Sequence, residues 1–301
     1  QQNSTPLEKA RNRLRLCGFS DKEVKNLHVY LSEWYESNSL EDAVEKWETY
    51  GIKQNVVPNI QNVLLSFCLF NVQGWKSRAL EVLHLIQKAE ASLAICTEVG
   101  AYWDSFKLPN FNMFYQEGTN HCGGVTIAVG KHPKATKIDS NLENTIVVDI
   151  SGLSEPIRVI GIYWPESQKT NLKDLDSFIC KNTIISGDFN AAIVEWGSPK
   201  IDCRGKILKK WVDSRNLQFV PGTFNSSKRS LRNIDLTFTN FPGVEGVTLE
   251  FGTSDHWPIF SAPMCDPNNL DDIKIQAEFN EIMTNLSVCA TSVKPTSAAE
   301  L

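Results

Sequence analysis

The sequence predicts an α+β fold in which two β-sheets pack face to face, with helices on the outside. From Val63 onward, many short apolar segments of strand length follow one another, and only a few segments with helical period lie between them. Many strands with few interspersed helices favour sheet-on-sheet packing. The 301 residues have an apolar content of 42%, which is ordinary for a chain that buries a sizeable core.

Individual strands and helices follow from the spacing of the apolar residues. Two segments between the strands have helical period, SRALEVLHLIQKAE and RGKILKKWVDSRN. The predicted strands, in chain order, are VLLSFCLFNV, SLAICTE, GGVTIAVG, NTIVVDI, IRVIGIYWP, NTIISGDFN, NLQFV, IDLTFTN and VEGVTLEF.

The chain divides into three predicted parts. Residues 1–58 carry three segments with apolar residues at helical spacing, so we expect a helical N-terminal extension, with a capping box at Ser20 and a helix end at Gly51. Residues 59–265 form the strand-rich domain. Residues 266–301 are expected to form one helix followed by a small, polar, disordered tail.

The net charge of -5 argues against a protein that coats nucleic acid non-specifically, since such proteins are usually basic. One stretch is nevertheless rich in cations, with Asp213 as its only acid. It forms either a solvated helix face and loop or an edge that contacts phosphates. Its cations are Arg204, Lys206, Lys209, Lys210, Arg215, Lys228, Arg229 and Arg232.

The eight cysteines are scattered singly and form no CxxC pair, so the spacing of a zinc ribbon is absent. Cys68 and Cys96 lie in apolar runs, which predicts buried free thiols and a reducing compartment. The sequence has neither a secretory apolar region near its start nor an apolar run of membrane-spanning length. We therefore expect a soluble, intracellular protein with no membrane partner.

Polar residues stand at the ends of the predicted apolar strands, where a packed core stops and side chains can converge. Any one of them alone has an ordinary structural explanation, such as a solvated carboxylate or a core aromatic side chain. Their joint order and placement point to a site. These residues are Asn71, Glu98, Tyr163, Asp188, Asn190, Asp235, Asp255 and His256.

The residue types suit a metal-assisted attack on a phosphodiester. Glu98 and Asp255 are hard oxygen ligands of the kind that Mg²⁺ prefers. A metal there polarises a phosphoryl oxygen and stabilises the leaving group. The amide of Asn71 can orient a carboxylate, the metal or a phosphate without adding charge.

The remaining polar residues supply the other elements of the reaction. Asp188 can hold or deprotonate a water, and Asn190 can orient it. His256 can donate to a phosphate oxygen, while Asp235 fixes the imidazole tautomer and raises its pKa.

The segments FNVQG, TEVG, IYWP, SGDFNA, IDLTFTN and SDHWPI, in this order over about 63–263, resemble the endonuclease/exonuclease/phosphatase superfamily. HCGGVTIAV, the WGS and RG of EWGSPKIDCRGKILKKWVDSRNLQFV, and PGTF before IDLTFTN are similar to the apurinic-like endonuclease domain of non-LTR (LINE-type) retrotransposons. The sequence departs from that family in having Thr97, where Gln is usual, and no His after GDFNA.

The resemblance implies a four-layer α/β sandwich for residues 59–265, with the site at one end of two packed sheets. It assigns Asn71 and Glu98 to the metal, Asp255 to the metal side, and Tyr163 to the scissile phosphate. Asp188 and Asn190 are expected to act on the water, and Asp235 to support His256. Thr223, Arg204 and Arg232 are the expected substrate contacts.

The expected activity is Mg²⁺-dependent nicking of DNA to leave a 3′-hydroxyl, with Mn²⁺ as an alternative metal. In retrotransposons of this family the nick primes reverse transcription, so a reverse transcriptase encoded downstream or elsewhere is an expected partner, and the nucleus the expected place of action. Three alternatives stay open at this point. They are an abasic-site repair endonuclease, a phosphatase of the same superfamily, and a catalytically decayed remnant that binds nucleic acid.

Overall fold

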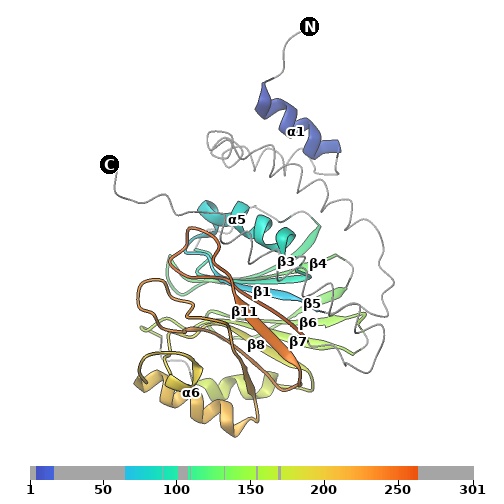
Figure 1. Cartoon of the computed structure of the whole chain (residues 1–301). Coiled ribbons are helices and arrows are strands. Elements are labelled where there is room, and N and C mark those ends of the chain that lie inside the picture. The colour runs from blue at the N-terminus through green and yellow to red at the C-terminus, as the bar shows by residue number, and fades with distance from the viewer. Residues whose placement is uncertain are drawn as a thin grey trace, which may run out of the picture.

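The computed structural model of the chain describes residues 5–16, 65–89, 91–100, 108, 110–131, 133–153, 155–168 and 171–263. Two six-stranded sheets form the centre of the molecule (Figure 1). The first sheet has the order β11-β12-β1-β2-β4-β3 and the second the order β5-β6-β7-β8-β10-β9.

The strand bounds agree with most of the predicted segments. The first sheet contains β1 (Phe67–Asn71), β2 (Leu93–Thr97), β3 (Phe111–Gln116), β4 (Val125–Gly130), β11 (Val244–Thr248) and β12 (Ile259–Pro263). The second sheet contains β5 (Lys134–Ile138), β6 (Thr145–Ser151), β7 (Ile157–Tyr163), β8 (Thr183–Asp188), β9 (Gln218–Val220) and β10 (Asp235–Thr239).

Each sheet has one parallel pair of neighbouring strands, β1 with β2 and β7 with β8, and all its other pairs are antiparallel. Parallel neighbours need a crossover connection. Helix α5 (Trp75–Lys88) makes the first crossover, and the 3-10 helix η2 (Leu172–Phe178) lies within the second. The carboxyl ends of the two parallel strands of each pair therefore meet at one edge of their sheet.

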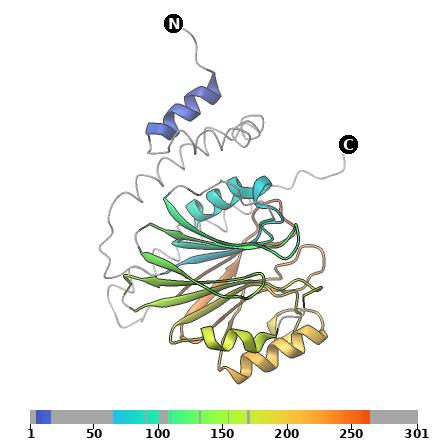
Figure 2. The same ribbon diagram turned by 180° about the vertical axis from the view of Figure 1, so that it is seen from behind.

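Helices cover the outer faces of the two sheets, which gives four layers (Figures 1 and 2). Helix α5 buries residues such as Leu83 and Ile86 in a core with the first sheet, and a second core fills the space between the sheets. Helix α6 (Cys203–Ser214), η2 and the short 3-10 helix η3 (Val194–Trp196) share a third core with the second sheet. The predicted four-layer sandwich with mainly antiparallel sheets is confirmed.

The local signals that start the helices are readable in the sequence. Asp202 caps α6, and its carboxylate accepts a hydrogen bond from the Gly205 amide at 2.6 Å. Helix α1 (Pro6–Leu16) begins at a capping box in which Thr5 and Glu8 each accept from the other's backbone amide.

Several predictions fall on residues that the structure does not describe. Of the predicted helical extension 1–58, residues 5–16 are described and contain α1. The capping box at Ser20, the helix end at Gly51 and everything predicted for 266–301 lie outside the described residues. The domain boundaries near 58 and 265 stay predictions.

Three strands were not predicted, namely β3, β5 and β12. Strands β3 and β5 lie at sheet edges and most of their side chains are exposed or only partly buried, so their sequences FNMFYQ and KATKI lack a continuous apolar run. The short β12 follows Pro258 directly, and its sequence IFSAP mixes small and apolar residues.

The prediction of buried free thiols is confirmed for two of the five described cysteines. Cys68 and Cys96 are buried and free, and burial raises the pKa of both thiols. For Cys122, Cys180 and Cys203 the prediction is wrong, because these free thiols are exposed, in a loop, beside a strand and at a helix start. The other cysteines lie outside the described residues.

Two neighbouring residues of α6 test how far the third core stabilises the fold. Leu208 is fully buried, whereas Ile207 is 58% exposed. We expect Leu208→Ala to lower the free energy of unfolding by about 2–5 kcal/mol, since it removes methyl groups and leaves a cavity. The matched truncation Ile207→Ala is expected to change it by less than about 0.5 kcal/mol. Urea denaturation measures both values, and equal losses would contradict the packing described here.

Candidate active site

The register of the strands brings the predicted polar residues to one end of the sandwich. In the first sheet Asn71 pairs with Thr97, so Glu98 follows directly at the same edge. In the second sheet Asp188 pairs with Tyr163 on one side and with Asp235 on the other. The two edges meet where the sheets face each other.

A single amide joins the carboxylates of the two sheets. The Asn71 Nδ2 group donates to Glu98 Oε1 at 2.9 Å and to Asp188 Oδ2 at 2.9 Å. The amide oxygen faces the other way and accepts from the Gln73 backbone N–H at 3.1 Å. That N–H fixes the orientation of the amide, because a flipped amide would set its donors against the Gln73 donor and its oxygen against two carboxylates.

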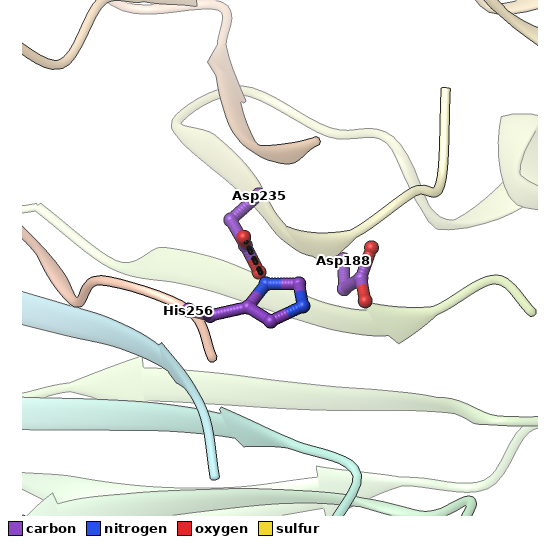
Figure 3. A group of neighbouring side chains, drawn as sticks. All are labelled: Asp188, Asp235 and His256. Carbon is purple, nitrogen blue, oxygen red and sulfur yellow. Dashed lines mark hydrogen bonds and ion pairs between the residues drawn. The ribbon is translucent and has the colours of Figure 1, made fainter. Parts of the chain in front are cut away.

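His256 and Asp235 form a buried pair. Asp235 Oδ2 lies 2.6 Å from His256 Nδ1, and the side chains are 1% and 9% exposed. Figure 3 shows the imidazole with this nitrogen on Asp235 and the opposite edge of the ring toward Asp188. The Ser226 hydroxyl accepts from the backbone amides of Ile234 and Asp235 and so fixes the start of β10. The Asp235 carboxylate thus fixes the orientation of the imidazole ring.

Asp188, Asp235 and His256 crowd together, with one ligand atom of each within 4.8 Å of the others. Burial, together with the charges of Asp235 and Glu98, raises the pKa of Asp188 to about 8. Burial opposes the charged form of His256. The charge and hydrogen bond of Asp235 and the charges of Asp188 and Asp255 outweigh that effect and raise the imidazole pKa to about 10. The site thus pairs a cationic imidazole with an easily protonated carboxylate.

Tyr163 and Asn190 complete this end of the second sheet. Tyr163 is buried, and its hydroxyl lies close to Glu98. Burial and the charges of Glu98 and Asp188 raise the phenol pKa, so the hydroxyl remains a donor. Asn190 adopts a positive φ of 46°, which Asn tolerates better than most residues, and its backbone N–H donates to Asp188 Oδ1 at 2.9 Å.

The segment 252–257 brings Asp255 and His256 to the carboxylates. The Ser254 hydroxyl donates to the Asn71 carbonyl at 2.7 Å, and Gln73 Oε1 accepts from the Asp255 N–H at 3.2 Å. Sequence reasoning missed Gln73, Ser254 and Ser226 as parts of the site. The first two lie inside the quoted motifs FNVQG and SDHWPI, which is the signal that could have found them, whereas Ser226 has none.

The residues at this edge fit a hard divalent cation. Glu98 and Asp255 offer carboxylate oxygens, and Asp255 Oδ1 is buried without a hydrogen-bond partner. The His256 Nε2 atom lies 3.8 Å from this oxygen, beyond hydrogen-bond distance. A buried carboxylate oxygen without a hydrogen bond is costly unless a cation compensates it, which leaves a place for a metal ion. The Asn71 amide oxygen is held by Gln73, so Asn71 is placed to orient the carboxylates around such a cation.

The predicted substrate contacts lie in different surroundings. The Thr223 side chain is exposed, with its hydroxyl accepting from the Thr248 N–H at 3.1 Å. Arg204 stacks 3.7 Å above the Trp164 ring and donates to the carbonyls of Trp164 and Phe189. It therefore ties the ends of β7 and β8 to α6. Arg232 donates to the Ser230 hydroxyl at 3.2 Å.

The basic stretch is mostly occupied by partners within the protein. Lys209 pairs with Asp213, and Arg215 pairs with Asp176. Arg229 pairs with Asp255 at 2.9 Å, and Lys228 donates to the Gly252 carbonyl at 2.9 Å. Neither predicted alternative, a solvated helix face and loop or an edge of free cations that contacts phosphates, fully describes the stretch.

The raised pKa values predict how stability depends on pH in the absence of metal. Asp188, with a pKa raised to about 8, and His256, with a pKa raised to about 10, both bind protons more tightly in the folded state. Stability from such groups is lost as pH rises from the unfolded toward the folded pKa. We expect the free energy of unfolding in EDTA to fall between pH 6.5 and pH 8, the window that both groups share.

Asp188→Asn is expected to make this pH dependence shallower, since the variant removes one of the two groups. Asp149→Asn serves as a control, because Asp149 pairs with Arg158 in the antiparallel part of the same sheet, outside the site. Urea denaturation across the pH range measures both effects. A slope that is identical in Asp188→Asn and the unmodified protein would contradict the electrostatics of the site.

Comparisons with known proteins show which proteins the chain is similar to. Residues 157–260 match the family model described as endonuclease-reverse transcriptase. Over 243 residues the chain is 23% identical to the RNA-directed DNA polymerase from mobile element jockey of Drosophila melanogaster, covering 74% of this chain and 26% of the jockey protein. The chain thus spans about a quarter of the length of that curated relative.

Solved structures share the fold. The endonuclease domain of TRAS1, a telomere-specific non-LTR retrotransposon, has a TM-score of 0.57 at 19% identity, covering 67% of this chain and 98% of that domain. The 3′-5′ exonuclease NExo from Neisseria meningitidis has a TM-score of 0.52 at 16% identity, covering 65% and 98%. An AP endonuclease from Archaeoglobus fulgidus has a TM-score of 0.50 at 16% identity, covering 66% and 99%.

Among the described residues, no helix combines the length and apolar character that crossing a membrane requires. The matched family model covers strands β7, β8, β9 and β10 of the second sheet and the His256 segment, the similarity to jockey covers most of the chain, and the fold is shared with TRAS1. The resemblance predicted from the sequence, to the endonuclease/exonuclease/phosphatase superfamily and to LINE-type retrotransposon proteins, is therefore confirmed.

Proposed function

We propose that this chain is a Mg²⁺-dependent DNA endonuclease that hydrolyses one phosphodiester bond and leaves a nick with a 3′-hydroxyl. The observation that carries the proposal is the buried Asp235–His256 pair beside Asp188. A charged imidazole favours attack on an anionic phosphate, because it donates a hydrogen bond to a phosphate oxygen on which negative charge develops in the transition state. The similarity to the jockey protein and to TRAS1 favours DNA as the substrate.

In the proposed reaction, the oxygen of a water forms a bond to phosphorus and the bond between phosphorus and the 3′ oxygen breaks. Asp188 takes the proton from the water, and its pKa of about 8 suits proton transfer near neutral pH. Asn190, beside Asp188 at the end of β8, orients the water. His256 and Tyr163 donate to non-bridging phosphate oxygens. The departing 3′ oxygen takes a proton from a solvent water to become the hydroxyl, and Asp188 returns its proton to solvent.

The metal, when bound by Glu98 and Asp255, supplies a Lewis acid for the phosphoryl oxygen and the leaving oxygen. Mg²⁺ suits this set because it prefers carboxylate oxygens and keeps several waters, and Mn²⁺ can replace it. Asn71 holds Glu98 and Asp188 at a fixed separation through its amide.

We also propose a context for the activity. A DNA nick with a 3′-hydroxyl can prime a reverse transcriptase, and the relative from jockey is named as an RNA-directed DNA polymerase. A reverse transcriptase, joined to this domain or encoded elsewhere, is thus the proposed partner. The nucleus, which holds the DNA target, is the proposed place of action.

Nicking of supercoiled plasmid tests the activity. The protein with Mg²⁺ is expected to convert supercoiled plasmid to the open circle, and EDTA is expected to stop the reaction. Asp188→Ala and His256→Ala are expected to lower the rate about 10²- to 10⁴-fold, as the loss of an acid or base group does. Asp213→Ala, an exposed carboxylate on α6, is the control and should retain full activity. Equal nicking by all variants would contradict the proposal.

The ends of the nick and the choice of substrate separate the related activities. Direct extension of the nicked circle by a DNA polymerase indicates a 3′-hydroxyl. A strong preference for a duplex with one abasic site would instead favour a repair endonuclease, because a damaged nucleotide is cheap to extrude. Hydrolysis of a phosphomonoester without nicking would favour a phosphatase. DNA binding without cleavage in either Mg²⁺ or Mn²⁺ would favour a decayed remnant.

Metal binding is measurable without turnover. Because Mg²⁺ binds the folded state, a concentration about 100 times its Kd should stabilise the protein by about 2.7 kcal/mol and raise Tm. Glu98→Ala is expected to reduce this rise strongly. Glu195→Ala, which removes a carboxylate 69% exposed on η3, should leave the rise unchanged. Differential scanning calorimetry distinguishes the two, and an equal rise in both variants would exclude Glu98 as a ligand.

A further inference from the structure

The segment 252–257 presents Asp255 and His256 to the site, yet it contains no helix or strand. Its position depends on contacts with the residues just before β10. Ser227 forms an isolated antiparallel bridge with His256, and the Trp257 N–H donates to the Ser226 carbonyl at 2.7 Å. The Lys228 N–H donates to the Asp255 carbonyl at 2.9 Å. Small displacements of this segment would move both functional side chains.

The Lys228 side chain adds two contacts at the two ends of the same segment. Its Nζ donates to the Gly252 carbonyl at 2.9 Å and lies 3.6 Å from the centroid of the Trp257 ring. A cation over an aromatic face is attracted by the ring's negative face, more strongly when partly desolvated. One lysine thus joins the first and last residues of the segment and holds Asp255 through its backbone.

A second element holds the segment from helix α5. The Glu81 carboxylate accepts from the backbone N–H of Thr253 at 3.0 Å and from the Thr253 hydroxyl. Between these anchors Gly252 adopts a φ of +81°, and a Cβ there would lie 2.9 Å from Glu81 Oε2. Lys228 and Glu81 therefore fix consecutive residues, Gly252 and Thr253, just before Ser254 and Asp255.

We propose that Lys228 is a positioning residue that locks the segment 252–257, and through it His256 and Asp255, for the reaction. The consequence for activity rests on the proposed endonuclease function. The alternative role for Lys228, expected of a cation in a basic stretch, is contact with a DNA phosphate. The two inward contacts of Nζ favour the positioning role, whereas the neighbouring Arg229 side chain is 75% exposed.

Lys228→Met tests the proposal, because Met keeps the apolar stem and removes the charge and the donor. We expect kcat for plasmid nicking to fall about 10- to 100-fold, since a small misplacement of reacting groups costs that much. KM and the salt dependence of DNA binding should not change. Lys228→Arg, which can both stack on Trp257 and donate to a carbonyl, should restore most of the activity.

The matched control is Lys88→Met. Lys88 also places its Nζ over an aromatic ring next to this segment, at 5.9 Å from the Phe251 centroid, but it has no part in the contacts described above. It should retain the unmodified kcat. If Lys228→Met does not fold, Lys228→Gln, which keeps a donor but no charge, tests the loss of the charge and of the contact with the Trp257 ring, and its kcat should again fall below that of Lys88→Met.

A readout without DNA separates failure of this proposal from failure of the proposed function. The NMR signals of the His256 imidazole should move in Lys228→Met and stay in place in Lys88→Met. If the unmodified protein does not nick DNA, the endonuclease proposal fails, and the His256 signals alone decide the role of Lys228. Unchanged His256 signals would overturn the positioning role. A higher KM with a salt slope reduced by about one would also overturn it and indicate a phosphate contact.

Discussion

The Asn71 amide is the contact on which the site depends. Its two N–H groups reach a carboxylate of each sheet, Glu98 in the first and Asp188 in the second, while its oxygen is held by the Gln73 N–H. Carboxylates that approach each other in a buried place repel, and the cost is high unless donors or cations compensate it. Asn71 compensates without adding a charge, and Asn71 is itself fully buried. A carboxylate at this position would add a further negative charge, and an apolar residue would leave two oxygens without a donor.

The architecture delivers the residues to this amide through its two parallel strand pairs. The pair β1–β2 ends at Asn71 and Thr97, next to Glu98, and the pair β7–β8 ends at Tyr163 and Asp188. In a wholly antiparallel sheet, neighbouring strands end at opposite edges, so each of these pairs would lose one of its polar ends from the site. The crossovers through α5 and η2 are therefore a functional requirement as much as a topological one. The core between the sheets holds the two edges in contact.

The sequence allowed the fold class, most central strands and the polar strand ends to be predicted, since a strand buried on both faces has a continuous apolar run and the motifs stand at its ends. Strands β3 and β5 were not predicted because most of their side chains are exposed or only partly buried, so no apolar run marks them. The partnership of Asn71 with Asp188 joins residues 117 positions apart, and local patterns carry no information on such a contact. The partners of the cations in the basic stretch could not be predicted for the same reason. The spacing of these residues in the sequence does not show that Arg204 donates to backbone carbonyls or that Lys228 donates to the Gly252 carbonyl.

The cations near the site do not all form ion pairs with its carboxylates. Among Glu98, Asp188, Asp235 and Asp255, ion pairs join two to the imidazole of His256 and one to the largely exposed Arg229, while Lys228 and Arg204 act on Asp255 and Asp188 through their charges alone. Burial and the charges of Asp235 and Glu98 raise the pKa of Asp188, so ionising this carboxyl without a metal costs free energy. The folded protein tolerates this cost because three apolar cores and the anchored segment 252–257 hold the site residues in place. A divalent cation would relieve it, so binding of the metal is favoured by the same repulsion that weakens the metal-free protein.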